Sequence, residues 1–287
     1  MPQTQHITLP QNDPFAVAPQ APLWWSLPIF LLMLPVTLIG VFLAVIACIT
    51  LVPLFPFLAG KLRDALAKVV TGTLIAAVRV RMRVIDHNPD PSHHAKLFVA
   101  PHIFMFEAIM MFRIVGHIRP LAAAFVKTIP VFNRVIAAVD PIYVGRSKGG
   151  NVVKRLRESL ETTDYRHAIF PEGTFTNGDT IIRFKSGAFA AGHPITPVIF
   201  RYPDYVPFWN RTESSLFMQI YRLLSRVQTP VTAEILPTYF PSAAEIADPS
   251  LYAENVRQLI SAATGRALSE CSLEDSPNYK KDRKNGH

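Results

Sequence analysis

The sequence predicts an α/β fold: a central, mostly parallel sheet covered by helices, preceded by an N-terminal membrane-embedded helical segment. A long uncharged apolar run near the start predicts the membrane segment. Short apolar runs that alternate with helical patterns after it predict the sheet and its helices. The composition agrees, since 49% of the 287 residues are hydrophobic and 17% are charged. Such a chain buries enough apolar surface to exclude disorder as its main state, and two cysteines exclude a disulfide scaffold.

The apolar run covers residues 23–60 and contains no charged side chain. It is too long for the apolar core of a signal peptide, and a soluble helix of this length is not apolar on every face. We therefore expect it to insert into a membrane. Four prolines interrupt the run: Pro28, Pro35, Pro53 and Pro56. Because each removes a backbone donor, a single tilted span and a re-entrant helical hairpin both fit the sequence.

Basic side chains flank only the second end of this run, where Lys61, Arg63 and Lys68 follow it. The positive-inside rule then places everything from Lys61 onward on the cytosolic side. The membrane is expected to be the endoplasmic reticulum in a eukaryote or the inner membrane in a bacterium. Residues 62–80 suit either a surface-lying amphipathic helix or a plain connecting helix.

We expect four regions along the chain. They are a polar N-terminus at 1–22, the membrane anchor and interfacial helix at 23–80, a folded domain at 81–270 and a charged tail at 271–287. Within the folded domain, apolar runs predict strands at 96–100, 118–123, 141–144, 168–170, 196–200 and 232–236. Helical patterns predict helices at 104–115, 151–162 and 249–263.

Two segments contain residue types suited to chemistry. In the first, His102 follows the strand 96–100 and Glu107 follows five residues later. These side chains can meet if His102 lies in the turn before a helix and Glu107 in its first turn, because five positions within a helix would separate them. A carboxylate-held imidazole can take a proton from a hydroxyl. A non-catalytic pair of the same spacing is the alternative.

The second segment, residues 167–178, runs from a strand into a turn rich in Gly, Thr and Asn. Backbone N–H groups in such a turn can bind an anion, and Thr174 and Thr176 can add hydroxyl donors. An ordinary connecting turn would show the same composition. The net charge of +8 suits an anionic lipid or a phosphorylated ligand.

These motifs, taken in order, resemble those of the glycerophospholipid acyltransferases, the 1-acylglycerol-3-phosphate acyltransferase superfamily. The matching motifs are HX4E at 102–107, IYVGR at 142–146, FPEGT at 170–174 and ITPV at 195–198. The segment EGTFTNGDTIIRFKSGAFAAGHPITPVIFRYP is closest to the lysophosphatidylcholine and lysophosphatidylethanolamine acyltransferase branch. The YAENVR sequence at 252–257 also resembles that branch. The resemblance covers roughly residues 80–265 and implies that the folded domain is an acyltransferase.

The resemblance implies a membrane-bound enzyme that transfers a fatty acyl group from acyl-CoA to the free hydroxyl of a lysophospholipid. His102 would be the general base and Glu107 would hold and stabilise it. The acceptor and its phosphate would be bound by Lys127, Arg146, Glu172, Gly173 and Thr174. No cofactor and no metal are implied, with acyl-CoA as co-substrate. The partners are the two substrates and the bilayer, with no nucleic acid, and the oligomeric state is left open.

Three positions depart from the family pattern. Pro101 stands where Asn or Ser usually precedes the histidine, Glu107 stands where Asp is commoner, and Gly145 precedes Arg146 where Asp or Asn is common. A non-catalytic lipid-binding relative is therefore one alternative.

A serine lipase or esterase is another alternative. Residues 145–149 match the nucleophile elbow G-x-S-x-G. It would use Ser147, with Asp179 and His193 in the right chain order. However, no HGGG-type oxyanion segment precedes this motif.

Overall fold

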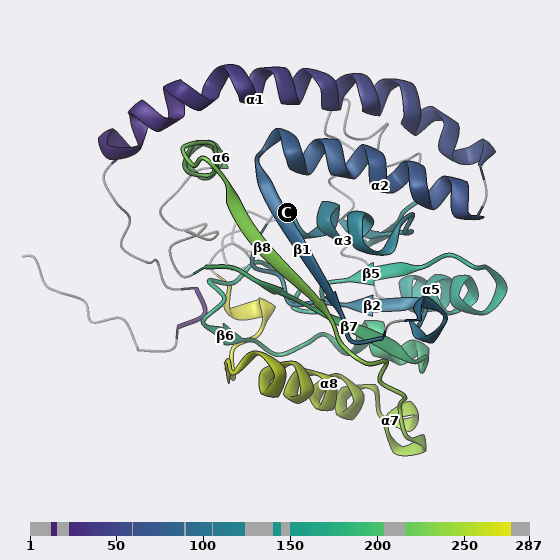
Figure 1. The fold of residues 1–287 in the computed structure, drawn as a ribbon. Helices are drawn as coiled ribbons and strands as arrows, with labels where there is room; N and C mark the ends of the chain where they lie inside the picture. Colours follow the sequence, from purple (N-terminus) through teal and green to yellow (C-terminus); the bar gives the residue numbers. More distant parts are fainter. Residues whose placement is uncertain are drawn as a thin grey trace, which may run out of the picture.

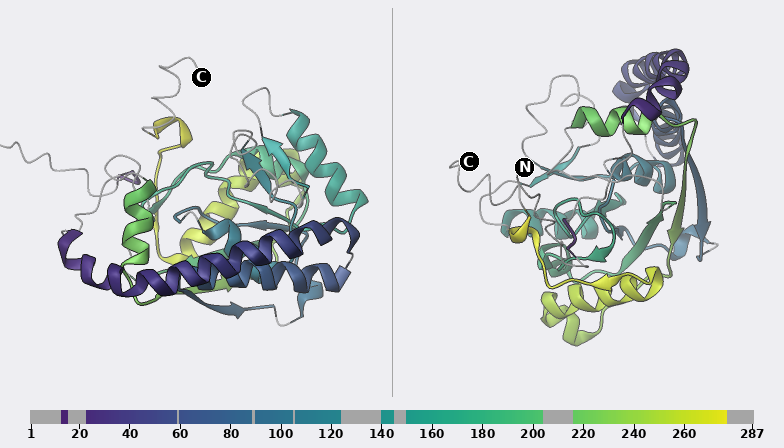
Figure 2. Two further views of the ribbon diagram at one scale, coloured as in Figure 1. Left: turned by 90° about the horizontal axis from the view of Figure 1, so that it is seen from above. Right: turned by 90° about the vertical axis from the view of Figure 1, so that its left-hand side faces the viewer.

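The computed structural model describes residues 13–15, 23–58, 60–88, 90–104, 106–123, 140–144, 150–203 and 216–276. A central sheet separates two layers of helices (Figure 1). The upper layer holds α1 (Leu23–Leu51), α2 (Gly60–Ala77), α3 (Glu107–Val115) and α6 (Leu216–Leu224). The lower layer holds α7 (Ala243–Ala247) and α8 (Pro249–Thr264), and the right-hand view of Figure 2 also shows α8 on the side away from α1.

The main sheet has five strands in the order β1-β8-β7-β2-β5. They are β1 (Val80–Asp86), β8 (Thr229–Ile235), β7 (Ile195–Arg201), β2 (Leu97–Val99) and β5 (His167–Ile169). Every neighbouring pair is parallel except β7 with β8. The predicted α/β fold with a mostly parallel sheet is therefore confirmed.

Side chains of the central strands are buried on both faces, as parallel strands require. Leu97 and Val99 of β2 pack into one apolar cluster with α8 and with α5 (Gly150–Thr162). Phe98, between them in sequence, packs into a second cluster with α2 and α3. This alternation follows the two-residue period of a strand, so each helix layer rests on its own half of the core.

Smaller elements complete the domain. Two short parallel pairs are formed by β3 (Leu121–Ala123) with β4 (Ile142–Val144), and by β6 (Thr180–Ile181) with β9 (Ala267–Leu268). The 3₁₀ segments are η1 (Val52–Phe57), η2 (Pro91–His93), η4 (Ser186–Ala191) and η5 (Leu273–Asp275). The six predicted strands and three predicted helices all overlap observed elements. The sequence patterns did not predict α6, β6 or β9.

The N-terminal apolar run forms a helical hairpin. α1 continues through Pro28 and Pro35, η1 makes the turn, and α2 returns against α1. By length and composition, Ser26–Leu54 is the one helix among the described residues that could cross a membrane. Its outer side chains, such as Leu32 at 69% exposed and Phe42 at 64%, face away from the protein.

α1 lies over α2 and α6 (Figures 1 and 2) and contacts α6, α2 and the residue Arg79 that follows α2. Near its start, the Ser26 hydroxyl bonds to the hydroxyl of Tyr221 on α6. In its middle, Arg79 donates to the Met33 carbonyl and to the Thr37 hydroxyl. A Cβ at Gly40 would lie 2.9 Å from the Ala77 Cα. α1 thus packs on both α2 and α6.

Candidate active site

Three side chains lie at one edge of the sheet, each just after the end of one of three neighbouring strands. His102 follows β2, Glu172 follows β5 and Tyr202 follows β7, and β2 is parallel to both β5 and β7. The carboxyl ends of parallel strands meet at the same edge, where sites of α/β proteins form. Glu107 joins them as the first residue of α3.

The His102 imidazole and the Glu107 carboxylate form a direct pair. Nδ1 of His102 lies 2.7 Å from Oε2 of Glu107, and the Ile103 N–H donates to the same oxygen at 2.9 Å. His102 lies in the turn before α3, as the five-residue spacing requires. Glu107 is fully buried, and its charge lies at the helix N-terminus, where the dipole stabilises an anion.

The second oxygen of Glu107 is held by a residue distant in sequence. The Tyr202 hydroxyl donates to Oε1 at 2.7 Å. Burial, with the Glu107 charge, raises the pKa of Tyr202 well above its ordinary value, so the hydroxyl stays protonated and remains a donor. Both carboxylate oxygens are therefore bonded, and the carboxylate is fixed in orientation toward His102.

The imidazole ring is held by aromatic packing as well as by Glu107. Its centroid lies 4.1 Å from that of Phe170, in a stacked arrangement, and 4.0 Å from that of Phe175. A carboxylate only accepts hydrogen bonds, so Nδ1 carries the proton and Nε2 has the free lone pair. Nε2 makes no hydrogen bond to any residue in the described ranges, and 16% of the side chain is exposed. This nitrogen can accept a proton from a ligand.

Glu172 supports the backbone of His102. Its Oε2 accepts the His102 N–H at 2.7 Å, and the side chain is 1% exposed. Burial, and to a lesser extent the Glu107 charge, raises the pKa of Glu172 to about 8. The next residue, Gly173, has φ +70°, and a Cβ there would lie 3.3 Å from Cε of Lys185. Thr174 is buried. The FPEGT turn thus shapes the site behind His102.

The raised pKa of Glu172 predicts that stability falls with rising pH. Below its ordinary pKa of 4.5 the carboxyl is protonated in both states, whereas between 4.5 and about 8 only the folded protein holds the proton. Each rise in pH across this window therefore favours unfolding. We expect the Tm of the wild type to fall more than that of Glu172→Gln between pH 6 and 8.5. Gln keeps an acceptor for the His102 N–H without titrating. Parallel Tm curves would contradict this assignment.

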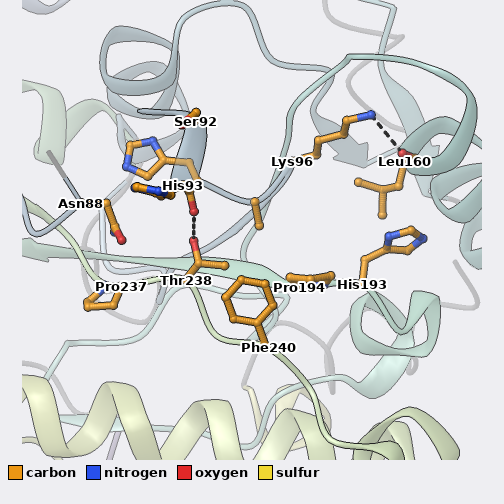
Figure 3. A pocket seen from close by; sticks show the side chains of 12 residues that line it. Asn88, Ser92, His93, Lys96, Leu160, His193, Pro194, Pro237, Thr238 and Phe240 are labelled. Atoms are coloured by element: carbon orange, nitrogen blue, oxygen red, sulfur yellow. Dashed lines mark hydrogen bonds between the residues drawn. The ribbon is translucent and has the colours of Figure 1, made fainter. Parts of the chain in front are cut away.

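Three predicted site residues, Lys127, Arg146 and Ser147, fall outside the described residues. Of the lipase alternative, Asp179 follows Gly178, where a Cβ would lie 3.1 Å from Ile103 at the His102 edge. His193 instead lines a pocket of about 560 Å³ at the amino ends of β2 and β7 (Figure 3). The structure therefore does not bring Asp179 and His193 together.

Two site residues were not predicted. Tyr202 lies in the RYP segment, but no local pattern predicts its hydrogen bond to Glu107. Arg266, directly before β9, is half-buried, and its positive charge acts on Glu172, Glu107 and Tyr202. No sequence pattern marks Arg266, because only the pairing of β9 with β6 brings it to this edge.

Residues 81–201 match the model of the family described as Acyltransferase. The chain is 32% identical to lysophosphatidylcholine acyltransferase 1 of Homo sapiens over 77% of this chain and 42% of that protein. It is 35% identical to lysophosphatidylcholine acyltransferase 1 of Danio rerio over 64% of this chain and 37% of that protein. A lysophospholipid acyltransferase of Arabidopsis thaliana is 37% identical over 55% of this chain and 42% of that protein. The chain thus spans about two fifths of the length of these relatives.

Among solved structures, the fold is similar to that of the 1-acyl-sn-glycerophosphate (LPA) acyltransferase PlsC from Thermotoga maritima. The TM-score is 0.55 at 19% sequence identity, and the match covers 83% of this chain and 98% of that chain. At this identity the likeness describes the fold.

Proposed function

Because residues 81–201 match the model of the acyltransferase family, we propose that this chain is an O-acyltransferase that moves a fatty acyl group from acyl-CoA to the free hydroxyl of a lysophospholipid. The observation that supports this most is the His102–Glu107 pair, with Nε2 free at the carboxyl edge of the sheet. The names of the relatives support lysophospholipids as acceptors.

In the proposed reaction, Nε2 of His102 takes the proton of the acceptor hydroxyl. The oxygen attacks the thioester carbonyl carbon, and the carbon–sulfur bond breaks when the tetrahedral intermediate collapses. The leaving CoA thiolate takes the proton from the imidazolium, so the products are the acylated lipid and CoA-SH. Glu107 stabilises the imidazolium that forms between these steps. The protein supplies no nucleophile, and no acyl-enzyme forms.

Cationic side chains would bind the phosphate of the acceptor or of CoA. Arg146 and Lys127 keep this proposed role from the family motifs. Arg266 adds a positive charge next to the buried carboxyl groups of Glu107 and Glu172, and guanidinium groups suit phosphate oxygens.

The function is tested by measuring CoA release from acyl-CoA with purified protein in detergent. Lysophosphatidylcholine, lysophosphatidylethanolamine and lysophosphatidic acid are supplied in turn, and the acylated product is identified by mass spectrometry. We expect release to require a lysophospholipid and to match product formation. Acyl-CoA consumption without lipid product, or hydrolysis of a phospholipid without CoA, would contradict the proposal.

We further propose that the α1–η1–α2 hairpin lies in one leaflet of the membrane, with the domain on the cytosolic side. The segment before α1 contacts the domain, because Asp13 and Pro14 bond to Asn177. The helix after it, α2, contacts the domain through α3. Both ends of α1 therefore belong on the same side of the membrane. The exposed apolar face of α1 suits acyl chains, and the basic residues Lys61, Arg63 and Lys68 suit the cytosolic leaflet.

This topology predicts labelling from one side only. In sealed vesicles, a chain with Cys271 as its single cysteine and a chain with Gln3→Cys as its single cysteine should react with an impermeant maleimide from the cytosolic face. Detergent-opened vesicles give the full signal for comparison. Labelling of the two positions from opposite faces would show that α1 crosses the membrane.

A further inference from the structure

Residues Asp13–Phe15, near the amino terminus, lie against the turn that follows the FPEGT motif. The Asn177 side chain donates through Nδ2 to the Asp13 carbonyl at 2.9 Å, and the Asn177 N–H donates to the Pro14 carbonyl at 2.8 Å. Pro14 is buried. We call residues 13–15 the N-terminal clamp.

The clamp has a conformation that its own sequence favours. The Asp13 carboxylate accepts the Phe15 N–H at 2.9 Å, which closes an Asx turn around Pro14. Proline fixes its own φ and restricts the residue before it to extended conformations. The carbonyls of Asp13 and Pro14 are thus held in position before Asn177 bonds to them.

The turn that the clamp holds is the turn that packs on His102. The Thr176 N–H donates to the His102 carbonyl at 3.0 Å, and the Phe175 ring lies 4.0 Å from the imidazole. Two consecutive N–H groups therefore have different acceptors: that of Thr176 donates to the His102 carbonyl, and that of Asn177 donates to the Pro14 carbonyl. Asn177 is two residues from Phe175, so the backbone connects the clamp to the ring that contacts His102.

We propose that the N-terminal clamp is a positioning element of the active site, which acts through Asn177 and Phe175 to fix the His102 imidazole relative to the acceptor hydroxyl. This inference rests on the proposed function. It assigns Asn177 a positioning role, because the Asn177 side chain donates to the Asp13 carbonyl and accepts the Asp179 N–H. The clamp itself provides no group that reacts.

The test uses a substitution that removes the hydrogen bond from Asn177 to the Asp13 carbonyl. Asn177→Asp keeps the oxygen that accepts the Asp179 N–H, but replaces the Nδ2 donor by an oxygen that repels the Asp13 carbonyl. We expect kcat to fall about tenfold, because small misplacements of a reacting group are costly. KM for acyl-CoA and the Tm should change little.

A matched control is Asn88→Asp. Asn88 also donates through Nδ2 to a backbone carbonyl, that of Leu236, at 2.8 Å, but it lies beside the pocket at the opposite edge of the sheet. The same chemical change there should leave kcat unaltered. An equal loss of kcat in both variants would overturn the inference.

A double-mutant cycle identifies the route of the effect. Replacing residues 13–15 by three glycines in the full chain removes the proline and its turn while keeping the length. If Asn177 acts through the clamp, Asn177→Asp costs little more in that background than the glycines cost alone. Additive losses, or full activity of the glycine variant, would overturn the inference.

A readout without turnover separates this inference from the proposed function. Hydrogen exchange of the 172–178 amides should be faster in Asn177→Asp and in the glycine variant than in the wild type and Asn88→Asp. If the wild type transfers no acyl group but exchange responds as expected, the function is wrong and the clamp is correct. If exchange does not change, the clamp does not hold the turn, whatever the activity.

Discussion

We expect His102→Ala to lower the kcat of acyl transfer by about 10³-fold, within the range of 10²–10⁴ that a general base contributes. Nε2 is the nitrogen that would take the proton, and it makes no hydrogen bond to the described part of the protein. The ring also fills the space against Phe170 and Phe175, so the Tm of the variant is measured beside kcat. CoA release with a saturating lysophospholipid is the assay.

Two variants serve as controls for the loss. His193→Ala removes a histidine at the opposite edge of the sheet and should retain activity. Ser147→Ala removes the nucleophile of the lipase alternative and should also retain it. If Ser147→Ala abolished turnover while His102→Ala kept it, the protein would be a hydrolase. A near-normal rate in His102→Ala at an unchanged Tm would contradict the general-base mechanism.

Glu107→Gln is expected to lower kcat by at least ~100-fold. Glutamine has the size of the native side chain, and its amide can bond to Tyr202, whose hydroxyl can then accept. It lacks the negative charge that stabilises the imidazolium. KM for acyl-CoA should change little, because the charge acts when the proton moves.

Glu107→Asp is the matched comparison, since it keeps the charge and shortens the reach by one methylene. The loss of kcat should be smaller than in Glu107→Gln, because His102 lies in a turn ahead of α3 and this turn can adjust. Tyr202→Phe, which removes the bond to Oε1 but keeps the charge, should be milder still. If Gln retained kcat while Asp lost it, Glu107 would be a packing and hydrogen-bonding element instead of a charge stabiliser.

The sequence could predict the fold and the centre of the site because both depend on local patterns. The strand-helix alternation predicted the sheet, and His102 and Glu107 are five residues apart, so one turn decides whether they meet. Glu172 was predicted from the FPEGT motif, which follows the neighbouring strand β5. The roles of these residues remain predictions, whereas the geometry that the His–Glu spacing requires is present.

The remaining parts of the site depend on contacts between distant residues. Tyr202 reaches Glu107 across 95 positions and Asn177 reaches Asp13 across 164. Neither distance leaves a periodic signal. The choice between a single span and a hairpin could not be made from the sequence for a different reason. Pro28 and Pro35 remain inside α1, so proline positions alone could not locate the turn of the hairpin.

The N-terminal clamp has a consequence for the order in which the chain assembles. During synthesis Asp13 leaves the ribosome first, yet its partner Asn177 follows 164 residues later. β1 likewise can pair only after β8 has been synthesised, since Val80 pairs with Thr229. Closing such long loops is slow. The proposed α1–α2 hairpin can enter the membrane early, whereas the His102 site is complete only after Tyr202 and β8 have been synthesised. A growing chain would therefore meet lipid well before its His102 site is assembled.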